Sequence, residues 1–82
     1  MGRELAKPDR LDAATKRWEL TPKQADVLGL LVHGLTNRSI AVSLGCSEST
    51  VELHVTALLR KAHCGGRAQL VARYWTDVET GR

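Results

Sequence analysis

Two cysteines and three histidines are the residues of this sequence that could bind a metal ion or form a nucleophile with its base. They are His33, Cys46, His54, His63 and Cys64. Their spacing matches no zinc-binding pattern. His63 and Cys64 are adjacent at the end of a predicted helix, where neighbouring side chains point apart, so they cannot work as a catalytic pair. We therefore expect no metal site, a structural role for His54, and two cysteines that act as small core hydrophobes.

The carboxylates and the glycine pair suggest no reaction either. Asp26, Glu48 and Glu52 do not form a catalytic pair, and Glu48 and Glu52 stand four residues apart on one helix, where they repel each other. Gly65-Gly66 follows no strand, so it predicts a turn and not a phosphate-binding loop. The sequence therefore gives no support for an enzyme and none for a cofactor.

The length and composition predict one small helical domain. The chain has 82 residues, of which 43% are hydrophobic and 26% charged, and its aromatic residues are Trp18, Tyr74 and Trp75. This is an ordinary globular composition, with a core of Leu, Val and Ala and no large ligand cavity. No apolar run approaches the ~20 residues needed to cross a bilayer, and no secretory segment is evident. We expect a soluble, cytoplasmic domain without a small-molecule ligand.

Positive charge is concentrated in the middle of the chain. The formal net charge is +3. Residues 37–73 hold five basic residues, Arg38, Arg60, Lys61, Arg67 and Arg73, against Glu48 and Glu52. This distribution suits a surface that meets nucleic acid, although a solvated basic helix face is an equally common explanation.

Capping residues mark the starts of the predicted helices. Residues 1–19 form an N-terminal leader, with a short helix after Pro8-Asp9 that either packs Trp18 on the domain or belongs to a linker. Thr21 and Gln24 form a capping box around Pro22, which predicts a helix over 22–33 that stops at Gly34. Thr36 begins a short second helix that ends at Gly45.

A third, longer helix over 48–62 follows the cap Ser47 after a turn of about three residues, which completes a helix-turn-helix pattern. A fourth helix from Arg67 carries Leu70, Val71, Tyr74, Trp75 and Val78, and residues 79–82 fray. The fold class is therefore all-α: a four-helix helix-turn-helix domain over 20–78, without a wing, preceded by the short leader helix.

The third helix has an unusual outer face. Its buried stripe is formed by five apolar residues: Val51, Val55, Leu58, Leu59 and Ala62. Opposite this stripe stand short or apolar side chains, with Glu52 on one flank: Ser49, Leu53, Thr56, Ala57 and Arg60. Such a slim face could touch base edges and thymine methyl groups in a major groove ~12 Å wide. A single exposed Leu53 is also normal on any protein surface.

Residues 20–75 resemble the LuxR-type (GerE-type) DNA-binding domain of bacterial transcriptional regulators. The resemblance rests on an ordered set of matches: Leu20-Thr21-Pro22, Val27-Leu28, Gly34-Leu35-Thr36-Asn37-Arg38, Ile40-Ala41, Leu44-Gly45, Ser47-Glu48, Thr50-Val51, His54, Lys61 and Arg67. It implies a four-helix domain, a third helix inserted in the major groove of double-stranded DNA, and a fourth helix that commonly forms a homodimer contact. RNA polymerase is a second partner to consider. The implied function is a sequence-specific transcriptional regulator or its output domain.

The resemblance also assigns roles to individual positions. It implies base contacts at Glu52, Leu53 and Thr56. It implies contacts with the phosphate backbone at Thr21, Asn37, Arg38, Ser47, Ser49, Thr50, Arg60, Lys61 and Arg67. Dimer contacts are expected at Leu70, Val71, Tyr74 and Trp75.

The sequence departs from the family pattern at several of these places. Glu52 stands where the family usually has Lys, and Thr56 where another basic residue is common. A carboxylate repels phosphate but can accept a hydrogen bond from cytosine N4, so we expect modest affinity with altered specificity or dependence on dimerisation. Ser39 weakens the capping box begun by Thr36. Gly66 and Gln69 replace an Asn cap and its Glu partner, which predicts a ragged start of the fourth helix.

Two other functions share part of the pattern. Region four of sigma factors uses similar helix-turn-helix logic for promoter recognition, but His54 and the segment from Arg67 fit the LuxR type better. A protein-interaction module that has lost DNA binding is the other alternative, and Glu52 is the best argument for it.

Overall fold

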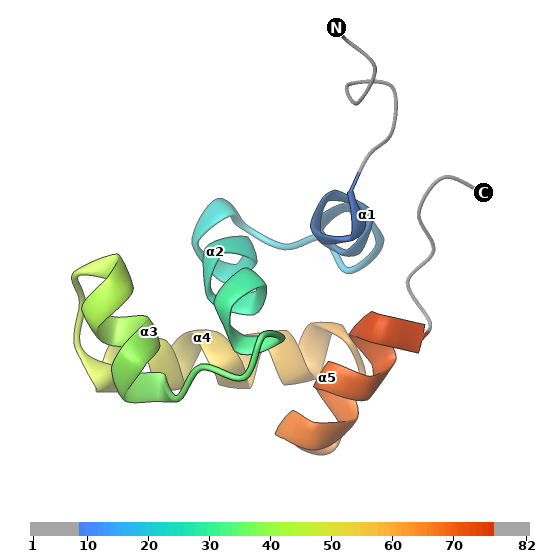
Figure 1. Cartoon of the computed structure of the whole chain (residues 1–82). Coiled ribbons are helices and arrows are strands. Elements are labelled where there is room, and N and C mark those ends of the chain that lie inside the picture. Colours follow the sequence, from blue (N-terminus) through green and yellow to red (C-terminus); the bar gives the residue numbers. More distant parts are fainter. Residues whose placement is uncertain (1–8, 77–82) are drawn as a thin grey trace, which may run out of the picture.

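The computed structural model describes residues 9–76 and is helical (Figure 1). The helices are α1 (Arg10–Arg17), α2 (Pro22–Leu31), α3 (Asn37–Leu44), α4 (Glu48–Lys61) and α5 (Arg67–Thr76). No strand occurs among the described residues. Helix α2 packs across the middle of α4, with α3 beside the beginning of α4 and α5 at its end (Figure 1). The all-α prediction, with four helices and a leader helix before them, is confirmed.

Helix α1 packs on the domain and is not a free linker. Asp9 caps it by accepting a hydrogen bond from the Asp12 amide at 2.8 Å. Ala14 and Trp18 are buried in the core. At Gly29 in α2, a Cβ atom would come within 3.1 Å of Cδ2 of Leu11, so the absence of a side chain there lets α1 approach closely. The docked alternative for the leader is the one observed.

Helix α2 begins as the capping signals predict. Oγ1 of Thr21 accepts from the Gln24 amide at 3.2 Å, and Oε1 of Gln24 accepts from the Thr21 amide at 3.1 Å. Pro22 occupies the first turn, where its missing N–H costs nothing. The helix ends at Leu31, two residues before the predicted end, and Gly34 adopts the left-handed conformation beyond it.

The helix-turn-helix unit is formed by α3 and α4. Thr36 caps α3 and Ser47 caps α4, each by accepting from an amide three residues on. Gly45 has a φ of 72°, a left-handed conformation that glycine adopts without strain, and this reverses the chain between the two helices. Oγ1 of Thr36 also donates to the Ser39 hydroxyl, so Ser39 makes only a hydroxyl contact where a longer side chain would complete a capping box.

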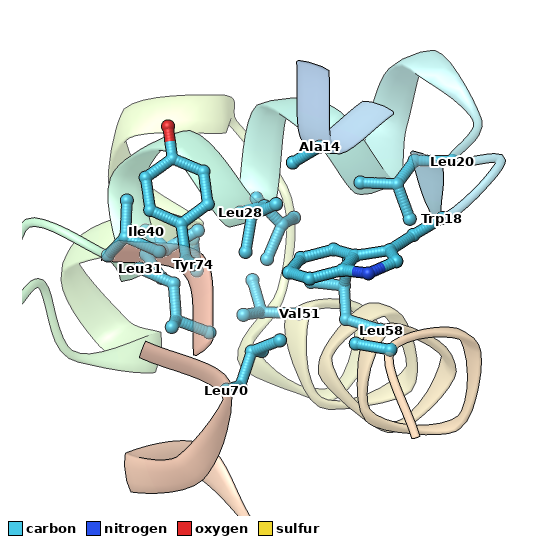
Figure 2. Packing of buried hydrophobic residues seen from close by; sticks show 14 residues of the cluster. Ala14, Trp18, Leu20, Leu28, Leu31, Ile40, Val51, Leu58, Leu70 and Tyr74 are labelled. Atoms are coloured by element: carbon cyan, nitrogen blue, oxygen red, sulfur yellow. The ribbon is translucent and has the colours of Figure 1, made fainter. Parts of the chain in front are cut away.

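The core lies between α2 and α4. Figure 2 shows Leu28 of α2 facing Val51 and Leu58 of α4, with Trp18 on one side of them and Tyr74 on the other. All five are buried. Burying one such apolar side chain contributes about 1.5–3 kcal/mol relative to leaving it exposed. These contacts hold α4 by its inner face.

Helix α5 differs from expectation along its apolar band. Leu70 and Tyr74 are buried in the core of the same chain, so they offer no surface to a second copy. At the start of α5, Oε1 of Gln69 accepts a hydrogen bond from the Gly65 amide at 2.7 Å, one residue before the cap position Gly66 that a capping box would use. Val78 and the predicted frayed tail, residues 79–82, lie outside the described residues.

Candidate nucleic-acid interface

The outer face of α4 is open to solvent. Glu52, Leu53 and Thr56 are exposed, and Leu53 is 71% exposed. Ser49 and Arg60 are exposed on the same helix. On the inner side Val51, Leu58 and Ala62 are buried, while Val55 and Leu59 are only half-buried. The apolar side chain of Leu53 therefore projects from α4 on the side opposite to the face that packs in the core.

Hydroxyl groups gather at the helix starts. Oγ of Ser47 accepts from the Thr50 amide at 3.1 Å and shares a hydrogen bond of 3.0 Å with the Thr50 hydroxyl. Thr21 and Thr36 make the equivalent contacts at the starts of α2 and α3. Amides and hydroxyls at a helix start favour an anion, because the helix dipole is positive there.

Lys61 holds the end of α4 against the start of α2. Its Nζ donates to the Glu19 carbonyl oxygen at 2.9 Å and to Oε1 of Gln24 at 2.7 Å. Gln24 belongs to the capping box of α2, so one half-buried ammonium group links three chain segments. Sequence reasoning placed Lys61 at the phosphate backbone and gave no sign of these internal partners.

Arg67 has a similar internal role. Its guanidinium donates to Oδ1 of Asn37 at 2.6 Å and to the Leu35 carbonyl oxygen, and thereby ties the start of α5 to the start of α3. Two residues expected at the DNA backbone thus contact each other. Arg38, in contrast, is exposed on α3. The pairing joins residues about thirty positions apart, and no local pattern could have revealed it.

The end of α5 depends on a residue that sequence reasoning did not single out, Arg10. Its Nη1 donates to the carbonyl oxygens of Tyr74 and Trp75, both at 3.2 Å. Trp75 in turn donates from Nε1 to the Val32 carbonyl oxygen at 3.1 Å and is 43% exposed. Burial raises the pKa of Tyr74 above its usual value, with Asp9 adding to this rise and Arg10 opposing it. The leader helix therefore anchors the last turn of α5.

The residues considered for metal or thiol chemistry do not gather into a metal-binding group within the described part of the chain. Cys46 and Cys64 are half-buried and pack against the apolar core, as expected. Among residues 9–76 no group of three or more His, Cys, Asp or Glu side chains could hold a metal ion. None of the helices over the same residues combines the length and apolarity of a bilayer-spanning segment.

Comparison with known proteins identifies the domain. Residues 19–74 match the family model described as bacterial regulatory proteins, luxR family. The nitrate/nitrite response regulator protein NarL of Escherichia coli is 39% identical over 61 residues, which are 74% of this chain and 27% of NarL. The two-component response regulator PprB of Pseudomonas aeruginosa is 46% identical over 52 residues, which are 63% of this chain and 19% of PprB. No solved structure matches at a significant level.

These matches distinguish a LuxR-type domain from region four of a sigma factor. The chain spans about a quarter or less of the length of these relatives. The matched family consists of non-enzymatic transcriptional regulators, and the match covers all of α2 to α4 and most of α5. The resemblance to region four of sigma factors is thereby set aside. The chain belongs to the LuxR family of bacterial regulatory proteins and carries its helix-turn-helix DNA-binding domain.

Proposed function

We propose that this chain is the DNA-binding output domain of a bacterial response-regulator transcription factor, which recognises specific sequences by inserting α4 into the major groove. The similarity to the response regulators NarL and PprB supports this assignment. The observation that most supports the proposal is the exposure of the outer face of α4. Leu53 is 71% exposed there, and Glu52 and Thr56 on the same face are also exposed. Such a factor acts on DNA in the bacterial cytoplasm.

The chemistry of this face suits base recognition. Leu53 can contact a thymine methyl group, Glu52 can accept a hydrogen bond from cytosine N4, and the Thr56 hydroxyl can donate or accept. Few long side chains block this face, so the helix backbone can approach the base edges. The pattern favours recognition of a small number of base pairs by three side chains.

Backbone contacts would fix the register of α4 on the duplex. Arg38 and Arg60 are exposed cations on α3 and α4, and Thr21, Ser47 and Ser49 are exposed at helix starts. Thr50 and Asn37 are half-buried beside them in the chain. Lys61 and Arg67 would in addition hold the helix ends, because each has two internal hydrogen-bond acceptors.

A homodimer is proposed through the exposed part of α5. Of the four residues expected there, Val71 is half-buried and Trp75 exposed. Val71 also lines a mainly apolar hollow with six other residues: Leu31, Val32, His33, Gly34, Arg67 and Ala68. A two-fold pair would present its α4 helices to half-sites about 34–36 Å apart. Once bound, the dimer could also meet RNA polymerase.

Selection of duplexes from a random library tests this function. We expect an enriched motif with two inverted half-sites whose centres are about one helical turn apart. Enrichment of a single half-site would support DNA recognition and contradict the homodimer. The absence of any enriched motif, with no binding to random duplexes at low salt, would instead favour a protein-interaction module. The presence of Glu52 on the outer face of α4 favours that alternative, because its carboxylate repels phosphate.

A further inference from the structure

The ends of α1 and α4 meet around a surface hollow lined mostly by basic side chains. Two overlapping depressions form it, and we call them together the basic hollow. It is lined by Arg17, Trp18, Glu19, Lys61, Ala62, His63 and Arg73. The lining thus includes three permanent cations, one histidine and one glutamate. Arg17 and Trp18 precede the family match at residues 19–74, so the leader helix supplies part of this surface.

The backbone of the basic hollow is unusual. Glu19 has a φ of 54° and His63 a φ of 57°, and they are the non-glycine residues with a left-handed backbone among residues 9–76. Each follows the last turn of a helix, a position that glycine normally occupies. Residues that bear a side chain and are held in sparsely populated backbone conformations tend to cluster at functional sites. Here both occur on the rim of the same hollow.

Part of the positive charge has a structural role. Arg73 donates to the carbonyl oxygens of Ala62 and His63, and Lys61 donates to that of Glu19, so these cations offset the negative ends of α4 and α1. An ammonium group has three N–H donors, and the two internal bonds of Lys61 leave the third for another acceptor. Arg17 lies in the exposed last turn of α1 and lines the same hollow.

The position of the basic hollow relative to the outer face of α4 indicates its ligand. Lys61 follows Leu53 by eight residues, which places it about 80° around the helix from Leu53, whereas Ala62 lies about 180° away in the core. The major groove is ~12 Å wide, close to the diameter of a helix, so the flanks of an inserted helix face the sugar–phosphate strands. The start of α2, joined to Lys61 through Gln24, lies on this flank and favours anions.

We infer that the basic hollow binds a phosphate of the DNA backbone and that Arg17 of the leader helix extends the DNA contact beyond the family domain. This inference rests on the proposed function. It predicts a sequence-independent contribution, because a phosphate contact carries no base information.

Salt titration of DNA binding tests the inference. The full chain and its variant Arg17→Gln are titrated with the selected duplex and with a scrambled duplex between 0.05 and 0.2 M salt, concentrations of about the range over which counterion release is measured. We expect the slope of log K against log salt to fall in magnitude by about 0.9 in Arg17→Gln, with affinity on the order of tenfold weaker at the lowest salt for both duplexes. Arg17→Lys should retain most of the slope.

Lys16→Gln is the matched control, because Lys16 is an exposed cation on the same turn of α1 and does not line the basic hollow. It should leave the slope unchanged. If Arg17→Gln behaves like Lys16→Gln while the wild type binds DNA, the hollow is not a phosphate site and the proposed function stands. If the wild type binds no duplex under any of these conditions, the proposed function and this inference both fail.

Discussion

The guanidinium carbon of Arg10 lies 5.3 Å from the centre of the Trp75 ring, so a residue at the start of the leader helix covers the side chain at the end of α5. The same guanidinium donates to two carbonyl oxygens in the last turn of α5. A cation at this end of a helix is favoured by the helix dipole and by the ring electrons. Arg10 therefore joins the start of α1 to the end of α5.

Arg10→Ala should lower the free energy of unfolding by about 1–2 kcal/mol, because it removes a helix-end cation and a cation–π contact together. Urea denaturation followed by circular dichroism measures the change. Arg38→Ala, which removes an exposed arginine from α3, should stay within about 0.5 kcal/mol of the wild type. Equal stabilities for the two variants would mean that Arg10 does not anchor α5.

The helix starts could be predicted from sequence because their causes are local. Thr21, Thr36 and Ser47 each cap a helix through an amide three residues away, and all three were identified from residue type and spacing. The long-range contacts of Arg10, Lys61 and Arg67 could not be predicted. They join segments 30 to 65 positions apart, and only the packing of α1 and α5 brings them together.

The dimer residues illustrate the same limit of local patterns. The spacing of Leu70, Val71, Tyr74 and Trp75 correctly indicates a wide apolar band on α5. It cannot say how much of that band the rest of the chain covers, and in the folded chain Leu70 and Tyr74 are buried. The exposure of Glu52, Leu53 and Thr56 was predicted correctly because the buried stripe of α4 has a regular helical period.

Tyr74 should make the domain less stable in alkali. Because burial raises its pKa in the folded state, the folded chain holds the phenol proton more tightly than the unfolded chain does. The free energy of unfolding should therefore be intact below a pH of about 10, the usual pKa of tyrosine, and decline as the pH rises through that value. Denaturation at a series of pH values, compared with Tyr74→Phe, measures this decline. A constant difference between the two proteins across the series would contradict it.

His63→Gly should stabilise the domain by about 1 kcal/mol. The backbone of His63 is left-handed, and this conformation costs any residue with a Cβ atom about 1 kcal/mol, whereas glycine adopts it at little cost. Thermal unfolding monitored by circular dichroism gives the change in Tm. Ala72→Gly, at an exposed interior position of α5, should destabilise by about 0.5–1 kcal/mol. Two shifts of the same sign would show that the conformation of His63 carries no strain.

Glu52→Lys should increase the affinity for DNA of any sequence. Removing a carboxylate and adding a cation beside the groove should steepen the slope of log K against log salt by about 0.9, with binding on the order of tenfold tighter at 0.05 M salt. Fluorescence anisotropy with labelled duplexes measures both. Asp12→Lys changes the net charge equally on the exposed surface of α1 and should have a much smaller effect. Unchanged affinity in Glu52→Lys over many sequences would mean that residue 52 does not reach the DNA.

The most direct test of base recognition by α4 is duplex selection from one random library with the wild type and with Glu52→Gln. A carboxylate accepts a hydrogen bond from cytosine N4, whereas an amide pairs with adenine N6 and N7. We predict that the preferred base changes from cytosine to adenine at one position of each half-site, while the other positions remain as they were. Two identical motifs would contradict the insertion of this face of α4 among the bases.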